Sequence, residues 1–197
     1  MNKIKVVHAV LAASAIFAAC KNDKKETESS RFEIETIEEL PGILDEHGKI
    51  GDGTSMNVLE FIKDAGDTLY VDMNSQAVMG GENIGDEVKL VYAQTDSTCN
   101  ALIAVNLTAL QHVWTQKGDD GNNQSLELNS NGRAATYNMS VDYDSWSVTN
   151  GTLLLHSPKK IGDESKEVVD TFDIMELTSE RLVLSNGLLT TEFQCDN

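Results

Sequence analysis

Asn-Gly turns that recur at short intervals are the feature that most constrains the fold of this chain. Asn and Gly readily adopt the left-handed backbone angles of tight hairpin turns. The dipeptide stands at residues 131–132, 150–151 and 186–187, and residues 118–123 form a further turn of Gly, Asp and Asn. Runs of alternating or β-branched residues fill the intervals, which predicts an antiparallel meander. The strands we expect are residues 111–116, 124–129, 134–141, 145–148, 152–156, 167–176, 181–185 and 188–194.

The preceding residues repeat this pattern on a smaller scale. Leu69, Val71 and Met73 alternate with polar or amphipathic neighbours, which is the period of a strand. We expect short strands at residues 49–52, 56–63, 67–74, 86–94 and 100–107. Such a set predicts a small closed barrel of the OB-like kind. The predicted fold class is therefore all-β, with a small OB-like barrel over residues 47–108 and an eight-stranded antiparallel barrel over residues 109–197.

Residues 1–19 have the three-part build of a secretory signal peptide. Lys3 and Lys5 give a basic start, and an apolar run then ends at two small residues, Ala18 and Ala19, directly before Cys20. The run is too short for a stable membrane span, so a signal peptide is favoured over its alternative, a helix of the mature fold.

The small-small-Cys ending resembles the lipobox of bacterial lipoproteins, although Phe17 replaces the more usual Leu. The resemblance implies that Cys20 is the lipid attachment site and the first residue of the mature chain. Two or three acyl chains would anchor the protein to the outer membrane, on its periplasmic or its surface face. The mostly polar residues 20–46 are predicted to be a flexible tether, with a short helix at residues 34–40 as an alternative.

The charge of the chain excludes one class of partner. The sequence has 15 Lys and Arg residues against 32 Asp and Glu residues, and loss of the signal peptide removes Lys3 and Lys5, which leaves a formal net charge of −19. Affinity for nucleic acids comes largely from cationic side chains that release counterions from phosphates. We therefore expect no nucleic-acid partner.

Several short motifs of the second half resemble the lipocalin-like domains of Gram-negative lipoproteins. The motifs of the first half resemble the OB-like module that often accompanies them. The resemblance covers most of residues 47–193 and implies that the eight-stranded barrel is lipocalin-like. His112 stands where lipocalins have the Gly of their Gly-x-Trp start. The motifs are residues 110–114, 126–128, 143–146, 151–155, 170–174 and 182–184 in the second half, and residues 51–59, 66–69 and 85–92 in the first.

The aromatic and cysteine residues supply the candidate sites. Trp114, Tyr143, Trp146 and Phe172 are candidates for an apolar pocket inside the second barrel, and the alternative is a plain filled core. Cys99 and Cys195 remain after lipidation of Cys20. Outside the cytoplasm they can form a disulfide, and the alternative is two separate thiols.

No motif of catalysis or of cofactor binding is found in the sequence. His47, His112 and His156 fall in different elements, with no two at metal-ligand spacing. Asp119, Asp120 and their neighbouring Asn residues lack the spacing of a calcium loop and are interpreted as a solvated hairpin tip. We expect no enzyme, no cofactor and no metal.

The architecture and the anchor together define two hypotheses about function. In the first, a lipid-anchored, non-enzymatic protein binds a small apolar ligand or envelope component in the lipocalin-like barrel. In the alternative, the barrels are filled and the protein is a structural or envelope-stress-sensing module that engages another envelope protein. A cavity in the second barrel would distinguish the two hypotheses.

Overall fold

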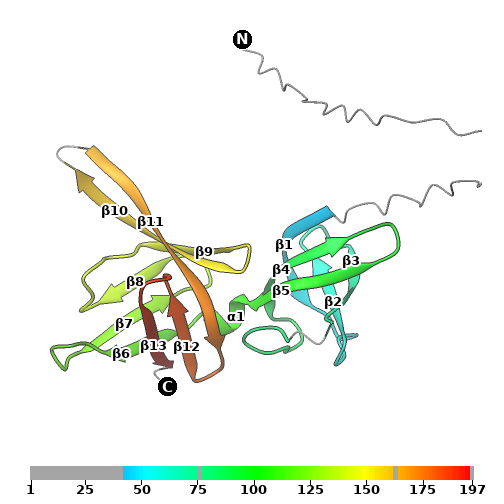
Figure 1. Cartoon of the computed structure of the whole chain (residues 1–197), viewed down its shortest axis with the longest axis horizontal. Coiled ribbons are helices and arrows are strands. Elements are labelled where there is room, and N and C mark those ends of the chain that lie inside the picture. The colour runs from blue at the N-terminus through cyan, green and yellow to red at the C-terminus, as the bar shows by residue number, and fades with distance from the viewer. Residues whose placement is uncertain (1–41, 75–76, 162–163, 196–197) are drawn as a thin grey trace, which may run out of the picture. The chain divides into compact units, whose positions relative to one another are not determined.

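The structure is a computed structural model that describes residues 42–74, 77–161 and 164–195 (Figure 1). These residues belong to one compact unit, Glu38–Asn197. The predicted signal peptide, Cys20 and the alternative helix at residues 34–40 lie outside the described residues. Within the described part, no helix is long and apolar enough to cross a membrane.

The first barrel consists of five strands. They close in the order β1-β2-β3-β5-β4, and β4 pairs again with β1. All neighbours are antiparallel except β3 and β5, which are parallel at Asp72 and Asn100. The closed barrel agrees with the predicted small OB-like barrel. The strands are β1 (Gly42–Ile50), β2 (Val58–Lys63), β3 (Thr68–Asp72), β4 (Glu87–Gln94) and β5 (Cys99–Asn106).

The start of β1 corrects the predicted boundary of the tether at residue 46. Gly42–Glu46 already form strand and pair with Gln94–Leu90 of β4. Ile43 is 66% exposed and Leu44 is 38% exposed. These residues therefore do not give the alternation of buried and exposed side chains by which a strand is recognised in a sequence. The backbone ladder with β4 forms this part of the strand, and such a long-range pairing has no local sequence signal.

The second barrel follows a single-turn helix, α1 (Leu107–Leu110). Its sheet has the order β8-β7-β6-β13-β12-β11-β10-β9, with antiparallel pairing throughout. One bridge, Arg133 to Ser145, links the two end strands, so the barrel is nearly closed. The predicted all-β class is thus confirmed. The strands are β6 (Val113–Lys117), β7 (Asn123–Leu128), β8 (Ala134–Tyr137), β9 (Ser145–Thr149), β10 (Thr152–Ile161), β11 (Glu164–Leu177), β12 (Arg181–Ser185) and β13 (Thr190–Cys195).

The β10–β11 hairpin is longer than the sequence predicts. The expected strands ended at residue 156 and began again at residue 167, whereas the pairing continues to Ile161 and Glu164. Pro158 and the charged residues around it break the apolar alternation on which the prediction depended. The extra length forms a two-stranded ribbon, visible in Figure 1 where β10 and β11 leave the other strands.

Two hydrophobic clusters form the cores, one in each barrel. Tyr92, Phe61 and Leu59 are among the fully buried residues of the first. Trp114, Leu126 and Leu153 are among those of the second. Each cluster comes from alternate positions of several strands, as expected when one face of a sheet turns inward.

Specific polar contacts join the two barrels. Asp45 Oδ2 on β1 accepts a hydrogen bond from the backbone N–H of Asn150 at 2.9 Å, in the β9–β10 turn. Asn150 (φ +50°) and Gly151 (φ +76°) have the left-handed angles that the Asn-Gly pair predicts. A Cβ on Gly151 would lie 2.6 Å from Ile103 Cγ2 of β5, so a side chain here would push the barrels apart.

Candidate functional site

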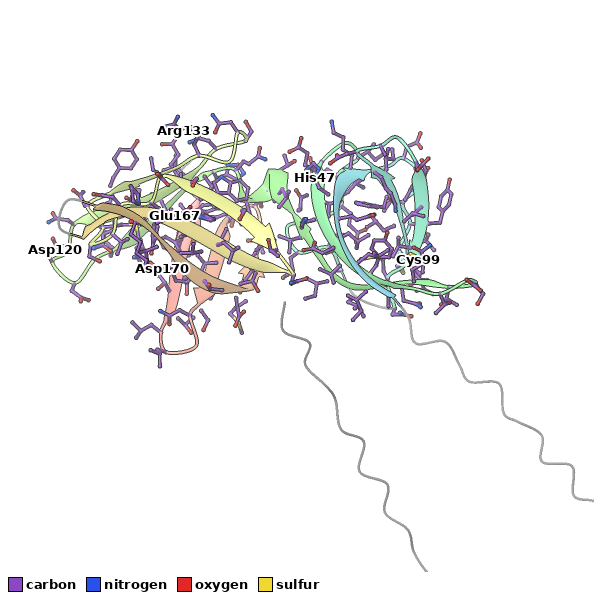
Figure 2. The ribbon with its side chains drawn as sticks, turned by 90° about the horizontal axis from the view of Figure 1, so that it is seen from above. His47, Cys99, Asp120, Arg133, Glu167 and Asp170 are labelled. Atoms are coloured by element: carbon purple, nitrogen blue, oxygen red, sulfur yellow. The ribbon has the colours of Figure 1, made fainter. Side chains whose placement is uncertain are left out.

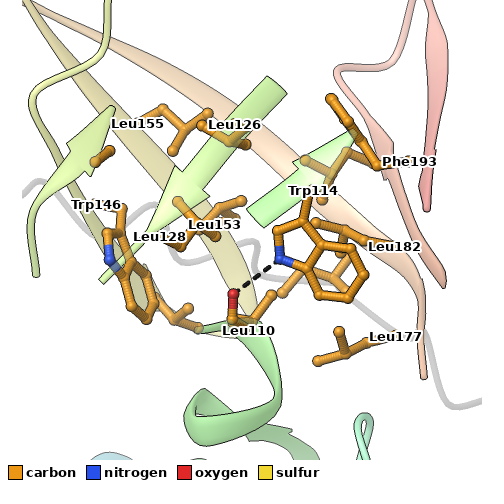
Figure 3. Packing of buried hydrophobic residues seen from close by; sticks show 14 of the residues in the cluster. Leu110, Trp114, Leu126, Leu128, Trp146, Leu153, Leu155, Leu177, Leu182 and Phe193 are labelled. Atoms are coloured by element: carbon orange, nitrogen blue, oxygen red, sulfur yellow. Dashed lines mark hydrogen bonds between the residues drawn. The ribbon is translucent and has the colours of Figure 1, made fainter. Parts of the chain in front are cut away.

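The two tryptophans of the second barrel lie in its hydrophobic core. Trp114 on β6 has no exposed surface, and its Nε1 donates to the Leu110 carbonyl oxygen at 2.9 Å. Trp146 on β9 is 8% exposed, and its Nε1 donates to the Asn129 carbonyl oxygen at 2.9 Å. Figure 3 shows both rings among leucines from several strands. Both indoles therefore fill the interior with their polar atoms satisfied.

Tyr143 and Phe172 belong to the same hydrophobic cluster. Phe172 is half-buried and packs against the cluster, and Tyr143 is buried within it. The Tyr143 hydroxyl donates to Asp170 Oδ2 of β11 at 2.7 Å. Burial and this hydrogen bond both raise the pKa of Tyr143, so it remains a neutral donor. The structure thus places all four pocket candidates in or against the core.

Two adjoining hollows lie along residues 77–81 and share Ala77 and Met79 as lining residues; we call them together the Met79 groove. The larger has a volume of about 570 Å³ and the smaller about 280 Å³. Apolar side chains from both barrels line them. Those of the larger hollow include Val78, Met79, Met175 and Leu177, and those of the smaller include Met79, Ile103 and Ile174.

Backbone hydrogen bonds hold the floor of the Met79 groove in place. Met79 bridges to β5, since its N–H donates to the Ala104 carbonyl at 2.9 Å and its carbonyl accepts from the Asn106 N–H at 2.8 Å. The Gly80 N–H donates to the Leu177 carbonyl at the end of β11, at 3.1 Å. Gly80 has φ +95°, and a Cβ there would lie 2.7 Å from Ala109 Cβ. Glycine is therefore required where this segment approaches the second barrel.

Two acidic side chains line the groove, Glu176 in the larger hollow and Asp173 in the smaller. Glu176, which lines the larger hollow, forms an ion pair with Arg181. Arg181 also pairs with Glu192 at 2.8 Å, and this hydrogen bond lowers the pKa of Glu192. The remaining lining is mostly apolar. The Met79 groove therefore suits an apolar ligand better than a charged one.

The His and Asp residues that the sequence singles out form local contacts in the described part of the chain. No cluster of three or more metal-ligating side chains is found among the described residues. His47 pairs with Asp64 at 2.8 Å, and His156 pairs with Glu167 at 2.7 Å. Asp120 accepts hydrogen bonds from Asn122 within its own turn, which lower the pKa of Asp120. Figure 2 shows His47, Asp120 and Glu167 far apart.

The two cysteines of the predicted disulfide lie in different barrels. Cys99 begins β5, and Cys195 ends β13. Both are half-buried, and the structure does not join their sulfur atoms. Burial raises the pKa of the Cys99 thiol, which makes it a poor nucleophile in the reduced state. The disulfide stays a prediction for the oxidised protein.

Sequence reasoning did not identify the Met79 groove. Its lining comes from residues 77–81, from β5 and from β11, segments that are distant in the chain. The local signal in the sequence is the pair Gly80-Gly81, which favours a loop with left-handed backbone angles. Both glycines have positive φ, but such a pair gives no indication of a groove.

Comparison with known proteins finds similarities to the second barrel. Residues 106–195 match the model of a family described as lipocalin-like. A crystal structure of a lipocalin-like protein from Bacteroides thetaiotaomicron VPI-5482 is 26% identical, with 45% of this chain and 97% of that chain covered and a TM-score of 0.39. No curated protein matches the chain. Residues 106–195, which form the second barrel, are therefore similar to lipocalin-like domains, as the sequence motifs predict.

Proposed function

We propose that this chain is a non-enzymatic lipoprotein that binds a small apolar ligand in the Met79 groove. The observation that carries the proposal is the apolar lining of that groove beside a lipocalin-like domain. The volume of the larger hollow, about 570 Å³, falls within the range of small-molecule sites, roughly 300–1,000 Å³. Sites of this kind often occur where two domains meet.

The filled core counts against the barrel interior, where the sequence predicts a ligand, and it leaves the groove as the place for one. The interior positions of the second barrel are occupied by Trp114, Leu126, Leu153 and other side chains with almost no exposed surface. Displacing such side chains costs several kcal/mol, of the order measured when a core is overpacked or a cavity is made. A ligand therefore binds at lower cost in the preformed groove than in the barrel interior.

The proposed location is extracytoplasmic, with a lipid anchor at Cys20 in the outer membrane. The signal-like residues 1–19 and the small-small-Cys ending support the anchor. Several acyl chains on one residue give firm attachment. The mass of the mature chain tests this part of the proposal, since lipidation adds diacylglycerol to residue 20.

A charge placed in the Met79 groove should weaken binding of an apolar probe. Met175 lines the larger hollow and is 63% exposed, so Met175→Glu should leave the fold intact. We expect the Kd for the neutral dye Nile red to rise at least about tenfold, since the carboxylate must be desolvated. Fluorescence titration of the lipid-free chain from residue 21, which retains the entire described fold, measures the change.

The matched control is Met56→Glu. Met56 is 89% exposed in the first barrel and is not among the lining residues of either hollow. It undergoes the same chemical change, and its Kd should stay within about twofold of the wild-type value. Equal Kd values for the two variants would contradict a ligand site in the Met79 groove.

The alternative, an interaction module, is favoured by a specific observation. The filled second barrel is what that hypothesis requires, and it leaves recognition to the surface. Ligand binding in the groove and protein contacts elsewhere on the surface are compatible. A substitution in the groove should weaken ligand binding, whereas a substitution elsewhere on the surface should weaken protein contacts.

A further inference from the structure

One edge of strand β11 is unpaired over much of its length. The β10–β11 ladder runs from Thr152 and Asp173 to Ile161 and Glu164, whereas β12 pairs with β11 only from Asp173 onward. Within the described part of the chain, residues 164–172 of β11 therefore have a neighbour on one side only. Such an edge presents backbone donors and acceptors that can pair with another strand.

The two edges of the ribbon differ in how well they are protected against pairing with another strand. Beyond His156, where pairing with β9 ends, the β10 edge contains Pro158, which has no backbone N–H to donate. The β11 edge has no proline, and Val169 on it is 44% exposed. Leu188 and Leu189, in the β12–β13 turn that follows the last β11–β12 pair, are 90% and 72% exposed. The β11 edge is thus open, and exposed apolar side chains lie where its pairing with β12 ends.

The charges on this edge complement those of a second copy. Two β11 strands paired antiparallel about a two-fold axis at Val168 place Lys166 directly opposite Asp170 of the other copy, twice in the interface. An axis at Val169 would place Lys166 opposite Phe172 and lose both pairs. Asp170 Oδ2 accepts a hydrogen bond from Tyr143 at 2.7 Å, and a carboxylate has a second oxygen that can accept from a lysine. Opposite charges that face each other across a ladder stabilise the pairing of the two strands.

We propose that residues 164–172 of β11 are a self-association edge, on which a second copy of this chain adds its own β11 in antiparallel register about Val168. Backbone hydrogen bonds supply the affinity, as in other cases of strand addition, and the Lys166–Asp170 pairs set the register. Each copy is strongly acidic, but the Debye length is only about 8 Å at physiological salt, so the net repulsion is largely screened. Attachment of both copies to one membrane would raise their effective concentration.

Cysteine cross-linking of the full-length protein in membranes tests this register. Val168 of one copy lies opposite Val168 of the other copy across the axis. Opposed Cα atoms lie about 4.5–5.5 Å apart, within reach of a disulfide. Val168→Cys should therefore give mainly covalent dimer after mild oxidation with copper phenanthroline. Thr171→Cys lies on the same edge, but two such residues would be about 20 Å apart, so it should give no more dimer than wild type.

A second variant tests the charges. Lys166→Glu in the Val168→Cys background should reduce the dimer yield at least threefold, whereas Lys117→Glu, the same change at an exposed site on β6, should not. Equal yields from Val168→Cys and Thr171→Cys would overturn the proposal. Cross-linking to a different protein in place of the dimer would overturn it too, because another occupant would then hold the edge.

Discussion

Replacing Trp114 by alanine should lower the free energy of unfolding by about 3–5 kcal/mol. The indole has no exposed surface and belongs to the cluster that fills the second barrel. Its removal leaves a cavity and also removes one of two donors to the Leu110 carbonyl, which keeps only the His112 backbone N–H. Urea unfolding followed by circular dichroism measures the loss.

Tyr137→Ala is the control for this substitution. Tyr137 is an aromatic residue of the same barrel, but it is 53% exposed, so its truncation should cost less than about 1 kcal/mol. A similarly small loss for Trp114→Ala would mean that the barrel interior is loosely packed. The interior would then again become the preferred place for a ligand.

Replacing Asn106 by alanine should cost about 2–4 kcal/mol, a large effect for a small side chain. Asn106 has no exposed surface, and its Nδ2 donates to the Gly81 carbonyl at 3.0 Å and to Asp86 Oδ2 at 2.7 Å. Its Oδ1 accepts from the Ala109 N–H at 2.9 Å and so caps α1. The alanine variant loses all three bonds where the two barrels connect.

Asn131→Ala is the matched control for Asn106→Ala. Asn131 also accepts a backbone N–H, that of Arg133 at 3.0 Å, but it lies in an exposed turn where water replaces the bond. We expect a loss below about 1 kcal/mol there, measured by the same urea unfolding. Equal losses for the two variants would contradict a structural role for the Asn106 network.

The turns of the second barrel could be predicted because their chemistry is local. Asn150 and Gly151 adopt the positive φ angles that an Asn-Gly hairpin requires, and β12 spans the expected residues 181–185. The start of β1 could not be predicted, because its ladder with β4 joins residues far apart in the chain. The parallel pairing of β3 with β5 could not be predicted for the same reason, because it also joins residues distant in the chain.

The candidate site was predicted less well than the fold, for a related reason. The sequence identifies Trp114 and Trp146 as large apolar side chains, but the same pattern describes a pocket and a filled core. Burial decides between them, and burial depends on neighbours from other strands. Met79 and Met175 meet at one groove only after folding, so no local pattern connects them.

The most direct test of the proposed function is native mass spectrometry of the mature protein extracted from membranes in mild detergent. We expect a chain that begins at Cys20 and carries diacylglycerol, together with a separate adduct of low mass that dissociates on collisional activation. Its loss from Met175→Glu, but not from Met56→Glu, would place that adduct in the Met79 groove. A mature chain with no dissociable adduct under any extraction condition would contradict the proposed binding function.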